Sequence, residues 1–164
     1  EAVSRLVADG LVEFEDQRGY RVTPVSPATL AEVTALRAEL DVMAVRASID
    51  HGGLDWESDV MRTHYLLTRC VRDPARPETL AAWEKAHSEF HLALIRGCEM
   101  PLLLPFGGLL HNMTDRYRHL YPLDYGVDRD IAAEHSEIAA AATARDNDRA
   151  CAALKSHILR TGEA

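Results

Sequence analysis

The sequence predicts an all-α protein, an antiparallel bundle of about six helices, preceded by the end of a helix and a β-hairpin. Three observations predict this fold. From residue 27 onward, apolar residues recur at intervals of three and four, as they do on one face of a helix. Alanine and leucine, which favour helices, are abundant, whereas aromatic residues make up only 6% of the chain. The breaks between periodic segments are short, as in antiparallel bundles.

Residues 1–26 follow a different pattern. The first eight residues carry apolar positions consistent with the last turns of a helix, and Gly10 provides a stop. Two β-type runs, LVEF and YRVT, are joined by a polar turn that contains Gly19, which predicts a hairpin. Because a helix end and a hairpin bury little apolar surface, we expect the chain to begin inside a small domain whose earlier part is absent.

The bundle is predicted over residues 27–164. A linker, Val25-Ser26 between Pro24 and Pro27, precedes it, with Ser26 as the N-cap of the first helix and Pro27 at the first helical position. That helix ends at His51-Gly52-Gly53. Further helical segments are expected at about residues 54–71, 78–97, 101–121, 128–144 and 149–161, the last with Asn147 or Asp148 as its N-cap.

The segment over residues 101–121 is interrupted by Pro105 and Gly107-Gly108. It is therefore expected to form one broken or kinked helix, or a short turn followed by a longer helix. The longest apolar run, residues 100–110, contains the same interruptions and is too short to span a bilayer. We expect no membrane partner.

Charge and cysteine content narrow the class of protein. A net charge of -8 argues against a chain that wraps nucleic acid by its overall charge, so any contact with DNA would be local. The three cysteines are odd in number and include no Cys-x-x-Cys pair. This usage suits the reducing cytoplasm and offers neither a disulfide framework nor a thiolate zinc site.

Four histidines, His87, His91, His135 and His157, have a spacing that indicates a metal site. Within the motif HSEFH, His87 and His91 are four residues apart and so project from one face of a helix. His135 and His157 lie on the last two predicted helices. Neutral imidazole binds zinc, nickel, copper and iron in preference to calcium or magnesium. Three helices could thus deliver four ligands to one divalent metal ion.

Spacing alone leaves a second interpretation open. A histidine on the apolar face of a helix is often a core residue, hydrogen-bonded to a carboxylate or a carbonyl group. His111 could face the same interior and is a weaker metal candidate. The other histidines, His51, His64 and His119, show no comparable spacing and are interpreted as surface or packing residues.

Three motifs carry a resemblance to a known family: RAELD at residues 37–41, HSEFH at residues 87–91, and the histidines of EHSEI and KSHIL. With them, residues 27–164 resemble the FCD ligand-binding domain of the FadR-like branch of GntR-type transcription regulators. Residues 1–26 resemble the end of the recognition helix and the wing hairpin of the winged helix-turn-helix that precedes such a domain. The resemblance thus implies a partial winged helix-turn-helix domain (1–26) and a helical effector-binding domain (27–164).

The resemblance also implies a ligand set. In that family the third-helix motif usually reads Asp-x-x-Phe-His, and its Asp and His bind a divalent metal together with two later histidines. By position, His91, His135 and His157 match, and His87 stands in place of the Asp. Loss of the anionic ligand should disfavour manganese and favour zinc or nickel, or leave His87 uncoordinated. Met100 is a second departure, because the family commonly carries Asn before this proline.

Metal sites of this family leave positions that a small organic acid effector can fill, while an arginine pairs with its carboxylate. Arg37, in RAELD, is the leading candidate for this arginine, and Arg116 is the second. Either could instead be a surface arginine whose aliphatic stem covers apolar neighbours.

Candidate DNA contacts are Arg18 and Arg21, which flank Gly19 in the hairpin, and Arg5 towards the helix end. They could touch phosphate or the minor groove, although two arginines are equally typical of a solvated hairpin. Most base-reading residues would lie earlier in the recognition helix, before Glu1. Operator DNA is therefore expected to bind only through the complete protein.

The resemblance implies a ligand-responsive, DNA-binding transcription regulator, homodimeric and cytoplasmic, and not an enzyme. Two alternatives stay open. One is a metal-dependent enzyme acting on a small carboxylate, because a metal with an open position can activate water. HSEFH is not the zinc-protease pattern, however, since Glu89 points away from the ligand face. The other alternative is a bundle with a purely structural metal.

Overall fold

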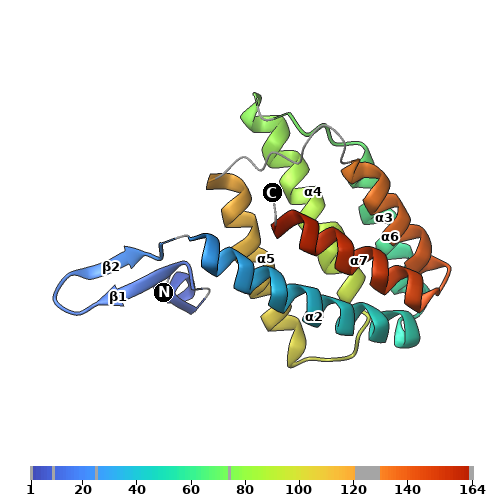
Figure 1. Ribbon diagram of the computed structural model, residues 1–164, viewed down its shortest axis with the longest axis horizontal. Coiled ribbons are helices and arrows are strands. Elements are labelled where there is room, and N and C mark those ends of the chain that lie inside the picture. The colour runs from blue at the N-terminus through green and yellow to red at the C-terminus, as the bar shows by residue number, and fades with distance from the viewer. Residues whose placement is uncertain (1, 9, 25, 74, 121–129, 163–164) are drawn as a thin grey trace.

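The computed structural model describes residues 2–8, 10–24, 26–73, 75–120 and 130–162, arranged as in Figure 1. A short helix, α1 (Ala2–Ala8), precedes an antiparallel hairpin of β1 (Val12–Glu15) and β2 (Gly19–Val22). The bundle consists of α2 (Pro27–His51), α3 (Leu54–Thr68), α4 (Pro77–Ile95), α5 (Leu103–Leu120), α6 (Ile131–Thr143) and α7 (Asn147–Gly162). The hairpin projects from the bundle beside the N-terminal end of α2 (Figure 1). The predicted all-α bundle behind a helix end and a hairpin is confirmed.

The hairpin has little core of its own. Its turn places Gly19 at a φ of 88°, a conformation that glycine adopts without strain. Across the two strands, the rings of Phe14 and Tyr20 meet edge to face with centroids 5.4 Å apart, but both side chains are exposed. Since two strands alone are marginally stable in water, contacts with the rest of the chain must hold the hairpin in place.

Capping residues set where two of the bundle helices begin. The hydroxyl of Ser26 accepts a hydrogen bond from the backbone N–H of Thr29 over 3.1 Å, so Ser26 is the N-cap of α2 as predicted. The prediction for α7 was wrong by one residue. Its N-cap is Asp146, whose carboxylate accepts from the N–H of Arg149 over 3.2 Å, and the helix already begins at Asn147.

Helix α5 runs through its proline and glycines. A turn at residues 101–102 precedes it, so the predicted short turn followed by a longer helix is correct. Pro105 lies in the first turn, where backbone N–H groups have no partner inside the helix, and so costs no hydrogen bond. At Gly107 an added Cβ would lie 3.0 Å from Cδ1 of Ile95. Glycine there lets α5 approach the end of α4 closely.

The core of the bundle lies where α2 packs against α7, α3 against α4, and α6 against α7. Its largest fully buried apolar side chains include Phe90, Leu94, Ile138 and Leu154. The same interior also holds histidines, arginines and carboxylates, and buried polar groups of this kind need partners. None of the helices in the described ranges is long and apolar enough to cross a membrane.

Candidate metal and effector site

Four buried histidines from three helices converge in the interior of the bundle, and we call them the histidine cluster. His87 and His91 lie one turn apart on α4, His135 lies on α6, and His157 lies on α7. One candidate ligand atom from each of the four lies within 4.8 Å of the other three. Each histidine exposes 4% of its surface or less. The structure thus brings together the four residues that the spacing singled out.

The histidine cluster contains nitrogens that lack partners. Nδ1 of His87, Nε2 of His91 and Nε2 of His135 are buried, and none has a hydrogen-bond partner among the described residues. A buried polar atom without a partner costs about 1–3 kcal/mol. Two nitrogens on one zinc ion lie at most about 4.2 Å apart. Only a small closing movement therefore separates the cluster from a set of metal ligands, and the donor set fits a divalent ion.

Burial favours the neutral form of three histidines of the cluster, His87, His91 and His135. It lowers the pKa of His87 well below the usual value, and the charge of Arg118 lowers that pKa further. Burial, followed by the neighbouring His157, likewise lowers the pKa of His91 and of His135. Because a metal binds the lone pair of neutral imidazole, these shifts favour coordination at neutral pH.

A carboxylate orients the fourth histidine. Nδ1–H of His157 donates to Oε2 of Glu134 over 2.7 Å, and Arg160 donates to the other oxygen of the same carboxylate. With its proton on Nδ1, His157 has Nε2 as its coordinating nitrogen. The role of Glu134 was not predicted from the sequence, although Glu134 directly precedes His135, because its contact depends on how α6 packs against α7.

Arg37 lies beside the histidine cluster in a buried polar network. Its Nε and Nη2 atoms donate to Oδ2 of Asp41 over 3.3 and 3.2 Å, and Nη2 lies 3.2 Å from Nε2 of His111. The rings of His111 and His91 have centroids 5.7 Å apart. Arg37 exposes only 3% of its surface, so it is an interior residue and not a surface arginine covering apolar neighbours.

Asp41 carries a negative charge in this network. Burial acts to raise the pKa of Asp41, but His111 and Arg37 outweigh burial and keep that pKa below its usual value. Nε2 of His111 lies 3.0 Å from Oδ2 of Asp41, and it can donate there only in the tautomer that cannot accept from Arg37. An incoming carboxylate would thus compete with Asp41 for the guanidinium group.

Arg118 is a second buried arginine whose charge acts on the histidine cluster, and it was not predicted from the sequence. Its Nε donates to Oε2 of Glu84 over 2.9 Å, and its guanidinium also contacts Asp115. Its charge acts on His87. Arg118 follows His111 by seven residues, which puts both on one face of α5, and that spacing was a signal available in the sequence.

Arg116 lies at the linker and not at the histidine cluster. Its Nη2 donates to the backbone carbonyl of Thr23, just before α2. Two residues along a helix turn the side chain by about 200°, so Arg116 and Arg118 face different neighbours. The structure therefore separates Arg116 from Arg37, with which it was grouped by sequence.

The candidate DNA-contacting arginines lie in the hairpin and in α1. Arg18 is exposed in the turn, whereas Arg21 donates to the carboxylates of Glu13 and Glu15 over 2.5 and 2.7 Å. Arg5 belongs to α1, but its side chain is outside the described residues. Contacts of these three arginines with DNA stay a prediction.

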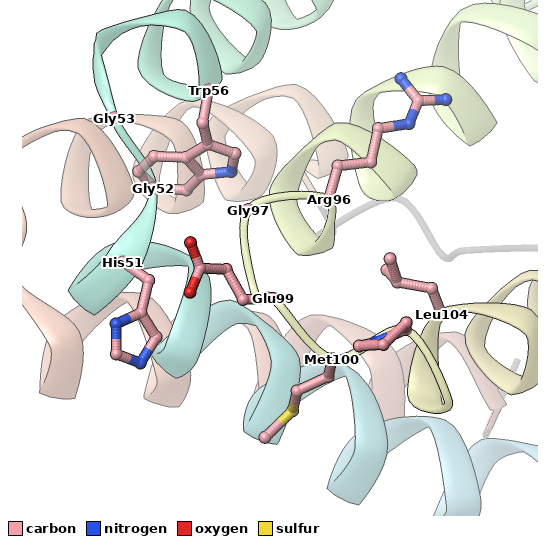
Figure 2. A pocket seen from close by; sticks show the side chains of 10 residues that line it. His51, Gly52, Gly53, Trp56, Arg96, Gly97, Glu99, Met100 and Leu104 are labelled. Carbon is pink, nitrogen blue, oxygen red and sulfur yellow. The ribbon is translucent and has the colours of Figure 1, made fainter.

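A surface hollow of about 350 Å³ lies at the junction of α2 with α3 and of α4 with α5. Figure 2 shows the indole of Trp56 between Gly52 and Gly97, where an added Cβ would lie 2.7 and 2.8 Å from the ring. The indole Nε1 donates to the carbonyl of Ala93, and Arg96 pairs with two acidic side chains. Among the described residues that line this hollow, every buried side-chain nitrogen or oxygen has a hydrogen-bond partner.

Comparison with known proteins places the chain among transcription regulators. Residues 32–160 match the FCD domain. The chain is 34% identical over 163 residues to the HTH-type transcriptional repressor GlaR of Escherichia coli (strain K12). This match covers 97% of this chain and 74% of that protein. It is 35% identical over 162 residues to the uncharacterized HTH-type transcriptional regulator BphR of Paraburkholderia xenovorans (strain LB400), covering 96% of this chain and 65% of that protein.

Solved structures share the fold. A GntR-family transcriptional regulator from Pseudomonas syringae pv. tomato str. DC3000 aligns with a TM-score of 0.71 at 20% identity, over 99% of this chain and 65% of that chain. E. coli McbR/YncC aligns with a TM-score of 0.74 at 19% identity, over 96% of this chain and 73% of that chain. The FCD match spans most of the bundle, and both curated relatives are named as regulators and not as enzymes. The chain belongs to the GntR family of transcription regulators, in the group that carries an FCD domain.

Proposed function

We propose that residues 27–164 sense a small organic acid at a divalent metal ion, zinc or nickel, held by the histidine cluster. Three buried imidazole nitrogens carry this proposal, because none of them has a hydrogen-bond partner among the residues that the structure describes. A carboxylate can bind such an ion as a further ligand, because the ion is positively charged. The charge of Arg37 acts on His91 and the charge of Arg118 acts on His87, so both guanidinium groups are close enough to attract an acid bound at the cluster.

The complete protein would bind operator DNA and regulate transcription there, with residues 1–26 as part of its winged helix-turn-helix. The proposed assembly is a cytoplasmic homodimer, because two recognition elements read paired half-sites. Acid binding would shift the equilibrium between arrangements that differ in operator affinity. The direct test measures operator affinity of the complete, zinc-loaded regulator with and without a panel of small organic acids. An affinity that no acid changes would contradict the proposal.

A purely structural metal is the second candidate, because the histidine cluster ties together α4, α6 and α7. Chelation would then lower the unfolding temperature while any acid response of operator binding persisted. If the metal takes part in sensing, chelation removes the acid response as well. The burial of Arg37 and Arg118 beside the cluster favours sensing, since a metal that only joins helices needs no arginine nearby.

The double variant R37Q/D41N tests the arginine. It removes both charges of a buried pair, so neither is left uncompensated. The affinity of the zinc-loaded protein for the acid should fall about 10- to 100-fold, as expected for a lost charge-assisted hydrogen bond. Calorimetric titration with the acid found in the operator assay measures this loss. The matched control R96Q/D59N removes a surface pair and should bind the acid normally; equal affinities in both variants would place the effector away from Arg37.

Glu134 offers a test of the histidine cluster that spares every histidine. E134Q keeps the shape of the side chain but weakens the acceptor for Nδ1–H of His157, so zinc affinity should fall about 10- to 100-fold. Competition with a chromogenic chelator measures zinc affinity. The control is E137Q on the same helix, where Glu137 pairs with Arg149 at the surface. If E134Q and E137Q bind zinc equally well, Glu134 does not support a metal ligand.

A further inference from the structure

Helix α5 joins the proposed effector site to the linker of the winged part. One of its faces carries His111, whose ring centroid lies 5.7 Å from that of His91, and Arg118, whose charge acts on His87. Another face carries Arg116 and Tyr117, and both of these residues contact the segment between the hairpin and α2. The same helix therefore meets the buried site and the linker within two turns.

Tyr117 holds the start of α2. Its buried hydroxyl accepts a hydrogen bond from the N–H of Ser26 over 3.2 Å and donates to the carbonyl of Ser26 over 3.1 Å. Two hydrogen bonds to one residue restrict both the position and the orientation of its backbone. Since Ser26 is the N-cap of α2, this contact sets the point at which the linker becomes helix.

Arg116 contacts the chain just before the linker, where the hairpin ends. Its guanidinium donates to the carbonyl of Thr23. Thr23 is itself tied to the base of the hairpin, because its N–H donates to the carbonyl of Leu11 and its hydroxyl donates to the carbonyl of Gly10 over 2.9 Å. Helix α5 is therefore hydrogen-bonded to the chain at Thr23, where the hairpin ends, and at Ser26, where α2 begins.

We propose that Arg116 and Tyr117 form a latch, the α5 latch, through which occupancy of the histidine cluster repositions the winged part. This inference rests on the proposed function. A helix moves largely as a rigid rod, so a displacement of His111 or Arg118 towards a bound ligand also displaces Tyr117. Shifts of about 1–2 Å by packed helices are a known kind of switching movement. Thr23 and Ser26 would follow, because their backbone groups are hydrogen-bonded to Arg116 and Tyr117.

The test uses zinc alone as the probe and the backbone amide of Ser26 as the reporter. This N–H bonds to Tyr117, so its hydrogen exchange, followed by NMR, reports on the latch directly. In the unchanged chain, zinc should alter the exchange rate about fivefold or more, the low end of couplings between sites. In Y117F, which keeps the ring but loses the hydroxyl, the ratio of rates with and without zinc should return to about one, while zinc still binds. The matched control is Y65F, which removes the hydroxyl of an exposed tyrosine on α3 and should behave like the unchanged chain.

The possible outcomes separate the latch from the proposed function. A zinc-dependent ratio that persists in Y117F would overturn the latch, because Tyr117 would then be a structural contact only. Zinc binding to the unchanged chain with no change at Ser26 would overturn the latch and leave the metal site standing. Failure of the unchanged chain to bind zinc would overturn both. In the complete regulator, Y117F should likewise uncouple operator affinity from the acid while acid affinity is retained.

Discussion

Zinc is expected to raise the unfolding temperature of this chain by about 5–10 °C and to have no such effect on H91A. A ligand present at 100 times its dissociation constant stabilises a protein by about 2.7 kcal/mol, and each kcal/mol corresponds to about 2–4 °C in a domain of this size. His91 is among the largest fully buried side chains, and its Nε2 has no hydrogen-bond partner in the part of the chain that the structure describes. The alanine variant therefore loses one of four converging ligands. Thermal unfolding with and without zinc measures the effect within each protein, so any destabilisation by the substitution itself cancels.

His64 supplies the control for this experiment. It is a half-buried histidine on α3 whose ring lies 5.5 Å from that of Phe90, and it does not belong to the histidine cluster. H64A should keep the full response to zinc. If H91A responds to zinc as strongly as H64A does, the histidine cluster is not the zinc site. Elemental analysis of the purified chain gives an independent reading of the bound metal.

The metal-free chain is expected to lose stability steeply as the pH falls below about 6.5. The folded-state pKa values of His87, His91 and His135 are lowered, chiefly by burial, from an ordinary value of 6.5. Above pH 6.5 these histidines are neutral in both states. Below it, the unfolded chain takes up protons that the folded chain does not, so the free energy of unfolding falls by up to about 1.4 kcal/mol per pH unit for each histidine. Together they would contribute up to about 4 kcal/mol per pH unit.

Urea unfolding with a chelator present, at pH 7.5, 6.5 and 5.5, measures this slope. H91Q provides the comparison, because glutamine does not titrate and one histidine contribution is removed. Its slope below pH 6.5 should be smaller by up to about 1.4 kcal/mol per pH unit. A free energy of unfolding that stays constant between pH 6.5 and 5.5 would show that the three imidazoles are not held neutral by the fold.

Local spacing in the sequence predicts only part of the histidine cluster. His87 and His91 share a helix, and a separation of four residues fixes them on one face whatever the rest of the chain does. His135 and His157 lie on other helices, and spacing alone left a core role open for them. Only the packing of α6 and α7 against α4 brings all four ligand atoms within 4.8 Å of one another.

The arginines show where local spacing fails. Arg37, Arg116 and Arg118 are all plausible effector contacts by residue type, and the last two are only two residues apart on α5. Which one faces the site depends on the rotation of α5 about its axis, which is set by contacts such as the close approach of Gly107 to Ile95. In the folded chain, the charge of Arg118 acts on His87, whereas Arg116 contacts the backbone carbonyl of Thr23.

By itself, the sequence determined the bundle of about six helices, the hairpin before it and the pair of histidines on α4, because helical periodicity, capping and turn residues act over a few neighbouring positions. Only the tertiary structure decided the partners of buried charges: Glu134 for His157, Asp41 and His111 for Arg37, and Ser26 for Tyr117. These contacts join residues from different helices, or from a helix and the linker. Their geometry follows from the rotation and depth at which helices pack, which no local pattern encodes.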